Sequence, residues 1–166
     1  MTPDASISIQ DLIPGTTPGL RAAAAAGSAD QVRVWDQVSQ SYKYYYLYLG
    51  FGPNTTKSNK WVENVTGQPV ATSLFKTGDA LFFYAASGST LTGLTIPGQV
   101  PNVADGVLKQ GFNMVGAGFP QEWNPNDAGT AFWSDSKFTA AAAAGSADQI
   151  RAWDQKSQGY KYYYLY

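Results

Sequence analysis

Residues 22–48 read AAAAAGSADQVRVWDQVSQSYKYYYLY, and residues 140–166 read AAAAAGSADQIRAWDQKSQGYKYYYLY. The two copies align without a gap at an offset of 118 residues. Only four positions differ, and these are Val32/Ile150, Val34/Ala152, Val38/Lys156 and Ser41/Gly159. The identity stops abruptly upstream of each copy, so the chain is not a tandem pair of complete domains.

The repeat divides the chain into four segments. Residues 1–21 form an N-terminal extension, 22–48 copy one, 49–139 a unique β body and 140–166 copy two. Either copy, joined to the body, supplies a similar set of elements, and the two orders are circular permutations of each other. The sequence therefore predicts one receptor body and two nearly interchangeable segments that complete it.

Each copy is predicted to be a short helix followed by a β-hairpin. The alanine run favours a brief helix. In copy two, Ser134 or Asp135 is placed to cap its start, and Gly145 to end it. Residues 31–36 then alternate in the pattern of a strand, with Val32 and Val34 on one face, opposite Arg33 and Trp35.

The second strand of the hairpin is rich in tyrosine. A period of two places Tyr42, Tyr44, Tyr46 and Tyr48 on one face, and Lys43, Tyr45 and Leu47 on the other. Both faces are largely aromatic or apolar, which predicts a strand that is covered on both sides.

The unique body also has a β pattern. The stretch KWVENVTG indicates a strand and turn, DALFFYAASGSTLTGLTIPG a hairpin turning at residues 87–89, and KQGFNMVGAGFP another strand. The expected fold is mainly β, an antiparallel sandwich or partly closed barrel, with short Ala-rich helices preceding two near-identical β-hairpins.

Composition narrows the functional classes. Only 14% of residues are charged and the net charge is −1, which provides no field for nucleic acid, and no stretch predicts a membrane span. There is no cysteine or histidine, which excludes disulfides, thiolate zinc sites and His-based triads, and no cofactor is expected. The start lacks the features of a signal peptide, so we expect either that a signal was removed and replaced by Met1 or that the chain is not exported by that route. The polar, weakly charged balance is typical of secreted β-proteins and predicts an extracellular or cell-surface location.

Several stretches in permuted order carry a family resemblance. GFNMVGAGFPQEWNPND, GSADQIRAWD, GYKYYYLY, KWVENVTGQP and TGDALFFYAASG together resemble the β-rich repeat domains of large bacterial secreted and surface proteins. The resemblance covers most of residues 61–166. It implies an adhesive or structural role, and it carries no catalytic residues.

Each candidate catalytic or metal site also has a purely structural interpretation. Glu63 and Glu122 are the only glutamates, and Glu122 precedes Trp123, as in some sugar-binding sites. A solvated loop residue is the favoured interpretation over one of a catalytic carboxylate pair. No enzyme is predicted. Residues 124–129, NPNDAG, have oxygen ligands but lack the spacing of a calcium loop, so an Asx-rich turn is favoured. The repeated pairs Asp30/Asp148 and Asp36/Asp154 are predicted to bond backbone amides.

Carbohydrate binding is the second functional class. Trp61, Trp123 and Trp133 lie outside the repeat, near predicted loops, where they are possible stacking platforms for glycans. Core and cross-strand packing is the favoured alternative for such aromatic residues.

The leading hypothesis is an extracellular structural subunit that self-assembles into a fibre or surface layer. One copy of the hairpin docks on, or is exchanged with, a neighbouring subunit. A recent duplication packed in one pseudo-symmetric domain is the alternative. A lectin-like module and an engineered or truncated repeat protein cut within copy two are further alternatives. The expected assembly residues are Trp35, Tyr42, Tyr44, Tyr46, Tyr48, Trp153, Tyr160, Tyr162, Tyr164 and Tyr166.

Overall fold

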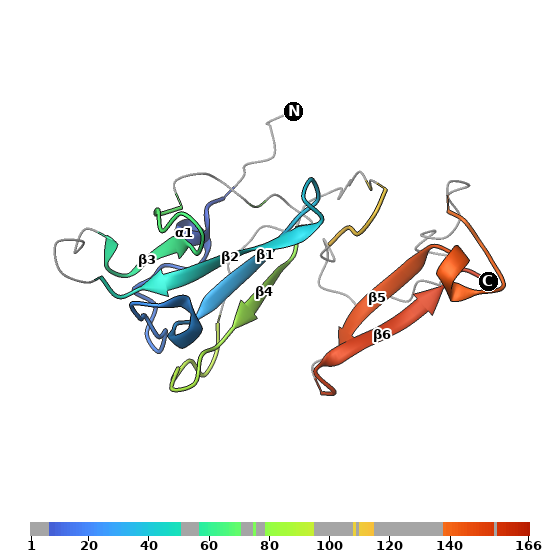
Figure 1. Cartoon of the computed structure of the whole chain (residues 1–166). Helices are drawn as coiled ribbons and strands as arrows, with labels where there is room; N and C mark the ends of the chain where they lie inside the picture. The colour runs from blue at the N-terminus through green and yellow to red at the C-terminus, as the bar shows by residue number, and fades with distance from the viewer. Residues whose placement is uncertain are drawn as a thin grey trace, which may run out of the picture. The chain divides into compact units, whose positions relative to one another are not determined.

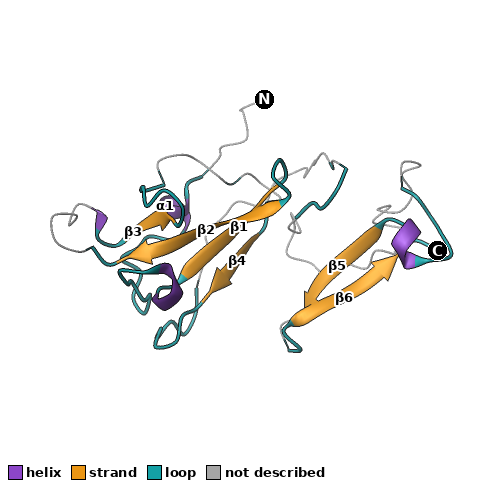
Figure 2. Cartoon of the chain, viewed as in Figure 1, coloured by secondary structure: helices purple, strands orange, loops and turns teal. Residues whose placement is uncertain are grey.

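A computed structural model describes residues 7–50, 57–70, 75, 79–94, 108, 110–114, 138–154 and 156–166. The chain divides into two compact units, Met1–Pro120 and Gln121–Tyr166, so the division falls inside the segment expected to be one body. Strands dominate the described residues and the helices are single short turns (Figure 2). The predicted mainly-β, antiparallel class is confirmed, and the sheets do not close into a barrel.

The first unit holds a four-stranded antiparallel sheet. Copy one supplies the two central strands, β1 (Gln31–Asp36) and β2 (Ser41–Tyr48). The body supplies the outer strands, β3 (Lys60–Glu63) and β4 (Leu81–Tyr84). The strand order is β3-β2-β1-β4, so the hairpin lies between two strands of the body (Figure 1).

The register fixes which residues share a face. Val32 lies opposite Tyr45 on β2 and opposite Phe83 on β4, while Leu47 lies opposite Trp61 on β3. These residues form the inner face of the sheet, as the predicted alternation requires. The outer face carries the row of even-numbered tyrosines on β2, together with Arg33 and Trp35 from β1 and Phe82 and Tyr84 from β4.

The inner face packs against the N-terminal extension. Helix α1 (Ile9–Leu12) is capped by Ser8, whose hydroxyl accepts a hydrogen bond from the Asp11 amide at 3.1 Å. Ile9 and Ile13 are fully buried in the core cluster with Val32, Tyr45, Leu47, Trp61 and Phe75. The extension therefore covers the hairpin.

The short helix predicted before each hairpin forms, but it does not extend over the alanine run. Only a 3-10 turn forms in each copy, Ala26–Ser28 and Ala144–Ser146, and Gly145 lies inside its turn. In copy one, the Ala23 amide donates to Leu47 O at 3.1 Å and the Leu49 amide donates to Ala23 O at 3.1 Å. Pairing with the end of β2 holds this segment extended, and these contacts override the local helix propensity of alanine.

Two further predictions for the body are wrong in part. The turn after β4 forms, with the Ser89 amide donating to Ala86 O at 2.9 Å, but residues 90–94 form no return strand. The Thr90 amide instead donates to Gly19 O at 3.1 Å. Residues 110–114 are not a strand, and the rest of that predicted strand lies outside the described residues, as do the proposed caps Ser134 and Asp135.

The second unit contains a two-stranded sheet built by copy two. Its strands are β5 (Gln149–Asp154) and β6 (Gly159–Tyr164). Within the part of the chain that the structure describes, these strands pair only with each other.

Trp61 is the largest fully buried side chain among the described residues, and its indole N–H donates to Ile13 O at 2.6 Å. Trp61→Ala should lower the free energy of unfolding by about 3–5 kcal/mol, because it leaves a cavity and an unpaired carbonyl. The milder Trp61→Phe should cost about 1–2 kcal/mol from the lost hydrogen bond. Chemical denaturation measures both, with Val65→Ala, at a position 90% exposed, as the control. A loss for Trp61→Ala no larger than the control's would contradict this core.

Candidate functional site

The two copies build the same hairpin. Gln31 lies opposite Tyr46 in copy one, and Gln149 lies opposite Tyr164 in copy two, at the same offset as the sequence repeat. Each turn ends with a glutamine in the left-handed backbone region. The angle φ is 51° at both Gln40 and Gln158. The hairpin is therefore specified by its own sequence.

Side-chain contacts within the hairpin also repeat. Trp35 packs edge-on against Tyr42 with ring centroids 4.9 Å apart, and the matching pair in copy two is 5.0 Å apart. The Arg33 guanidinium lies 5.0 Å from the centre of the Tyr44 ring, and the matching distance in copy two is also 5.0 Å.

An ion pair closes each turn. Asp36 lies 3.0 Å from Lys43, and Asp154 lies 3.2 Å from Lys161. The hydrogen bond from Lys43, with a smaller effect of the Val38 amide, lowers the pKa of Asp36 to about 2. Lys161 likewise lowers the pKa of Asp154. Because the folded-state pKa of Asp36 is depressed from 3.8, this contribution to stability is present above about pH 4 and is lost as the pH falls towards 2.

The two copies differ in what surrounds them. In copy one, Val32 and Leu47 are fully buried and Tyr45 is 5% exposed. Burial raises the pKa of the Tyr45 phenol. In copy two, the residue that matches Tyr45 is Tyr163, which is 47% exposed. The same inner row is thus a core in copy one, whereas in copy two Tyr163 is exposed and Ile150 and Leu165 are half-buried.

Asp30 joins copy one to the body. Its carboxylate is fully buried and accepts hydrogen bonds from the Arg21 amide at 2.8 Å, the Ala86 amide at 2.8 Å and the Ser89 hydroxyl at 3.1 Å. The last two donors come from the turn after β4. The predicted backbone-binding role of Asp30 is confirmed.

Asp148 makes only the local part of this network. It is exposed, and its carboxylate accepts from the Thr139 amide at 2.7 Å, which matches the bond from the Arg21 amide in copy one. Among the described residues, nothing in copy two corresponds to Ala86 or Ser89. In the part of the chain that the structure describes, copy two therefore has the local half of this site and no counterpart of the half that the body supplies.

The body also holds the turn of copy one. The Phe112 amide donates to the Gln40 side-chain oxygen at 2.6 Å, and the Trp35 indole donates to Phe112 O at 2.8 Å. The Gln37 side chain donates to Asn113 at 2.6 Å. We call the elements that enclose copy one the receptor site, which consists of α1, β3, β4 with its following turn, and residues 111–113.

The four substitutions between the copies spare most of this interface. Val38 is 88% exposed and Ser41 is also exposed, so their replacements lie in solvent. Val32 and Val34 do face the core, and copy two carries Ile150 and Ala152 there. Asp30, Tyr45 and Leu47 are retained as Asp148, Tyr163 and Leu165.

The expected assembly residues lie together on the outer face of each hairpin, opposite the inner row that the receptor site buries. This outer face is only partly covered in copy one, where Tyr44 is 39% exposed, so the predicted coverage of both faces is wrong. Sequence reasoning missed the inner row of copy two, Ile150, Tyr163 and Leu165. The burial of their counterparts identifies them, and the alternation alone does not say which face turns inward.

Trp61 does not support glycan stacking. It is 1% exposed and bonded to Ile13, so its ring presents no face to a ligand. The favoured interpretation, core packing, is confirmed for Trp61, and the glycan-stacking alternative is wrong there. The other two tryptophans proposed for glycans, Trp123 and Trp133, lie outside the described residues, as do Glu122 and residues 124–129.

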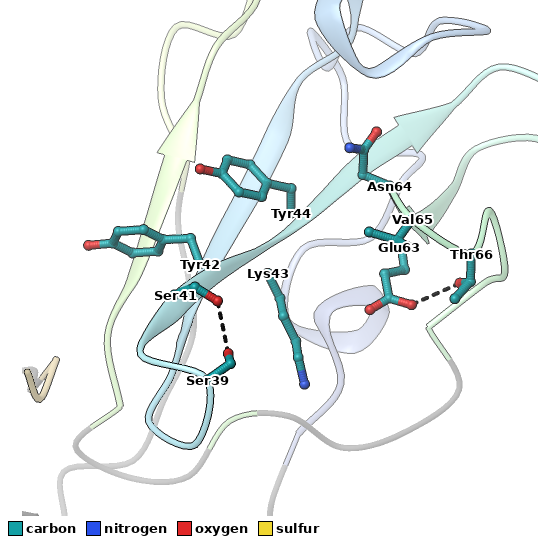
Figure 3. A pocket seen from close by; sticks show the side chains of 9 residues that line it. All are labelled: Ser39, Ser41, Tyr42, Lys43, Tyr44, Glu63, Asn64, Val65 and Thr66. Atoms are coloured by element: carbon teal, nitrogen blue, oxygen red, sulfur yellow. Dashed lines mark hydrogen bonds between the residues drawn. The ribbon is translucent and has the colours of Figure 1, made fainter.

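An open hollow lies where β2 runs past the end of β3 (Figure 3). Tyr42 and Tyr44 point to one side of β2 and Lys43 to the other. The only carboxylate in the hollow is Glu63, which accepts a hydrogen bond from the Thr66 hydroxyl at 2.8 Å. Lys43 pairs with Asp36. The residues that line the hollow thus include two tyrosines, but most of them are polar.

Within the described ranges, no three His, Cys, Asp or Glu side chains gather where they would hold a metal ion. A helix long and apolar enough to cross a bilayer is also not found among those residues. Comparison with known protein families, curated proteins and solved structures finds no match to this chain.

The two aspartates provide a matched test of the receptor site. In dilute solution, Asp30→Ala should lower the free energy of unfolding by at least about 2 kcal/mol, because it leaves buried donors unsatisfied. Asp148→Ala should change it by less than about 0.5 kcal/mol, because that site is exposed. Urea denaturation of both variants measures the difference. Equal losses would show that copy two is already enclosed as copy one is.

Proposed function

We propose that this chain is an extracellular or cell-surface structural subunit that self-assembles, with the hairpin of copy two as its docking element. The observation that carries the proposal is the contrast between two equal hairpins. One forms the centre of a four-stranded sheet, and the other has the same inner row at 47% exposure for Tyr163.

Hairpin physics supports this reading. A two-stranded hairpin is marginally stable in water, and three or more strands or a packed face are needed to stabilise it. In the described part of the chain, β5 and β6 have no third strand. Unpaired strand edges beside exposed aromatic rings favour pairing with another chain, in which main-chain hydrogen bonds supply affinity and side chains set the register.

Composition supports the location. The weak charge and the high content of tyrosine and tryptophan fit a surface β-protein better than a protein that binds nucleic acid or an anionic membrane. The resemblance to repeat domains of bacterial surface proteins supports an adhesive or structural role.

The inner row of copy two gives the direct test. Tyr163→Asp should leave a folded protein that no longer assembles, because a carboxylate buried at an apolar interface costs several kcal/mol. Tyr45→Asp should unfold the first unit instead, since Tyr45 is part of its core. Light scattering with size exclusion reports assembly, and thermal melting reports folding.

Val38→Asp is the control, because it adds the same charge at an exposed position in the turn of copy one. It should change neither assembly nor melting. A Tyr163→Asp protein that assembles as the parent does, or a parent that is monomeric at every concentration, would refute the proposed function.

A further inference from the structure

We propose that the partner of copy two is the receptor site of a second copy of this chain, and that copy two enters by displacing copy one. This inference rests on the proposed function and specifies its partner and its regulation. The basis is that the receptor site already encloses a hairpin with the same fold and nearly the same sequence.

Docking in the known register reproduces each type of contact. β3 pairs with β2 so that Lys60 lies opposite Tyr48, and Tyr166 is the matching residue of copy two. β4 pairs with β1 so that Tyr84 lies opposite Gln31, and Gln149 matches it. Placed this way, the carboxylate of Asp148 meets the Ala86 amide and the Ser89 hydroxyl of the second copy. The incomplete site in one chain is completed by residues of another.

The two core substitutions make copy two the weaker occupant. Val32 is fully buried, so Ile150 must fit one additional methylene group into a packed site. Ala152 removes two methyl groups from the position where Val34 packs against the core. Copy one also acts at a high effective concentration relative to a neighbour's copy two, because copy one belongs to the same chain as the receptor site. The receptor site is therefore normally filled by copy one.

This difference regulates assembly. Exchange requires copy one to leave first, so it should be slow under native conditions and faster where the sheet opens. Because both hairpins suit the same site, a chain that receives a neighbour's copy two releases a copy one with the same exposed inner row. Head-to-tail exchange that does not close on itself extends into a fibre.

Cysteine pairs test the register, and the chain has no cysteine of its own. A Lys60→Cys chain carrying a mass tag is mixed with an untagged Tyr166→Cys chain, and Tyr84→Cys with Gln149→Cys in the same way. Directly opposed residues in an antiparallel pair are about 4.5–5.5 Å apart, within disulfide reach. After incubation in mild urea and oxidation, both mixtures should give the tagged–untagged heterodimer. Lys60→Cys with Tyr162→Cys, four residues out of register, should give none.

A second variant tests the preference for copy one. Ala152→Val restores the methyl groups in copy two and should raise the heterodimer yield roughly tenfold, the equivalent of about 1.4 kcal/mol. No heterodimer from a chain that still assembles through Tyr163 would overturn this inference and leave the proposed function standing. Equal yields in and out of register, or no response to Ala152→Val, would also overturn it. A chain that never associates would overturn both.

Discussion

A hairpin of two strands cannot bury its own inner face, and this constraint governs the whole molecule. The row of Val32, Tyr45 and Leu47 is buried only because β3 and β4 extend the sheet and α1 covers it. Among the described residues, copy two forms the same strands, turn and ion pair without a third strand beside them. The local sequence therefore specifies much of the hairpin, and the receptor site is needed to bury its inner face in a core.

Asp30 takes part both in the local structure of the hairpin and in its enclosure by the receptor site. One of its hydrogen bonds, from the Arg21 amide, is local and is repeated in copy two at Asp148. Its other two, from Ala86 and Ser89, come from the body. A buried carboxylate is tolerated only when its acceptors are satisfied, so this residue makes enclosure of the hairpin specific as well as favourable. The retention of aspartate at position 148 preserves that specificity in a hairpin that is not enclosed in the same way.

The repeat, the strands of each hairpin and their alternation could be predicted from the sequence, because a period of two is a local property. The alanine runs were misjudged because Ala23 pairs with the end of β2, and such a long-range bond leaves no local signal. Ile9 and Ile13 were missed as core residues because two isoleucines in a short polar segment form too brief a pattern. The inward face of β2 was undetermined because tyrosines occupy both faces, and only the positions of α1 and β3 decide it.

Hydrogen exchange of the two tyrosine strands measures the central contrast most directly. Peptides from β2 and β6 differ in mass because Ser41 is replaced by Gly159. In the dilute monomer, β2 amides should be protected and β6 amides should exchange quickly. As the chains assemble, β6 amides should become protected, and β2 amides should lose protection in chains whose copy one has been displaced. Protection of β6 equal to that of β2 in the dilute monomer would contradict the account, and so would fast exchange of β6 at all concentrations.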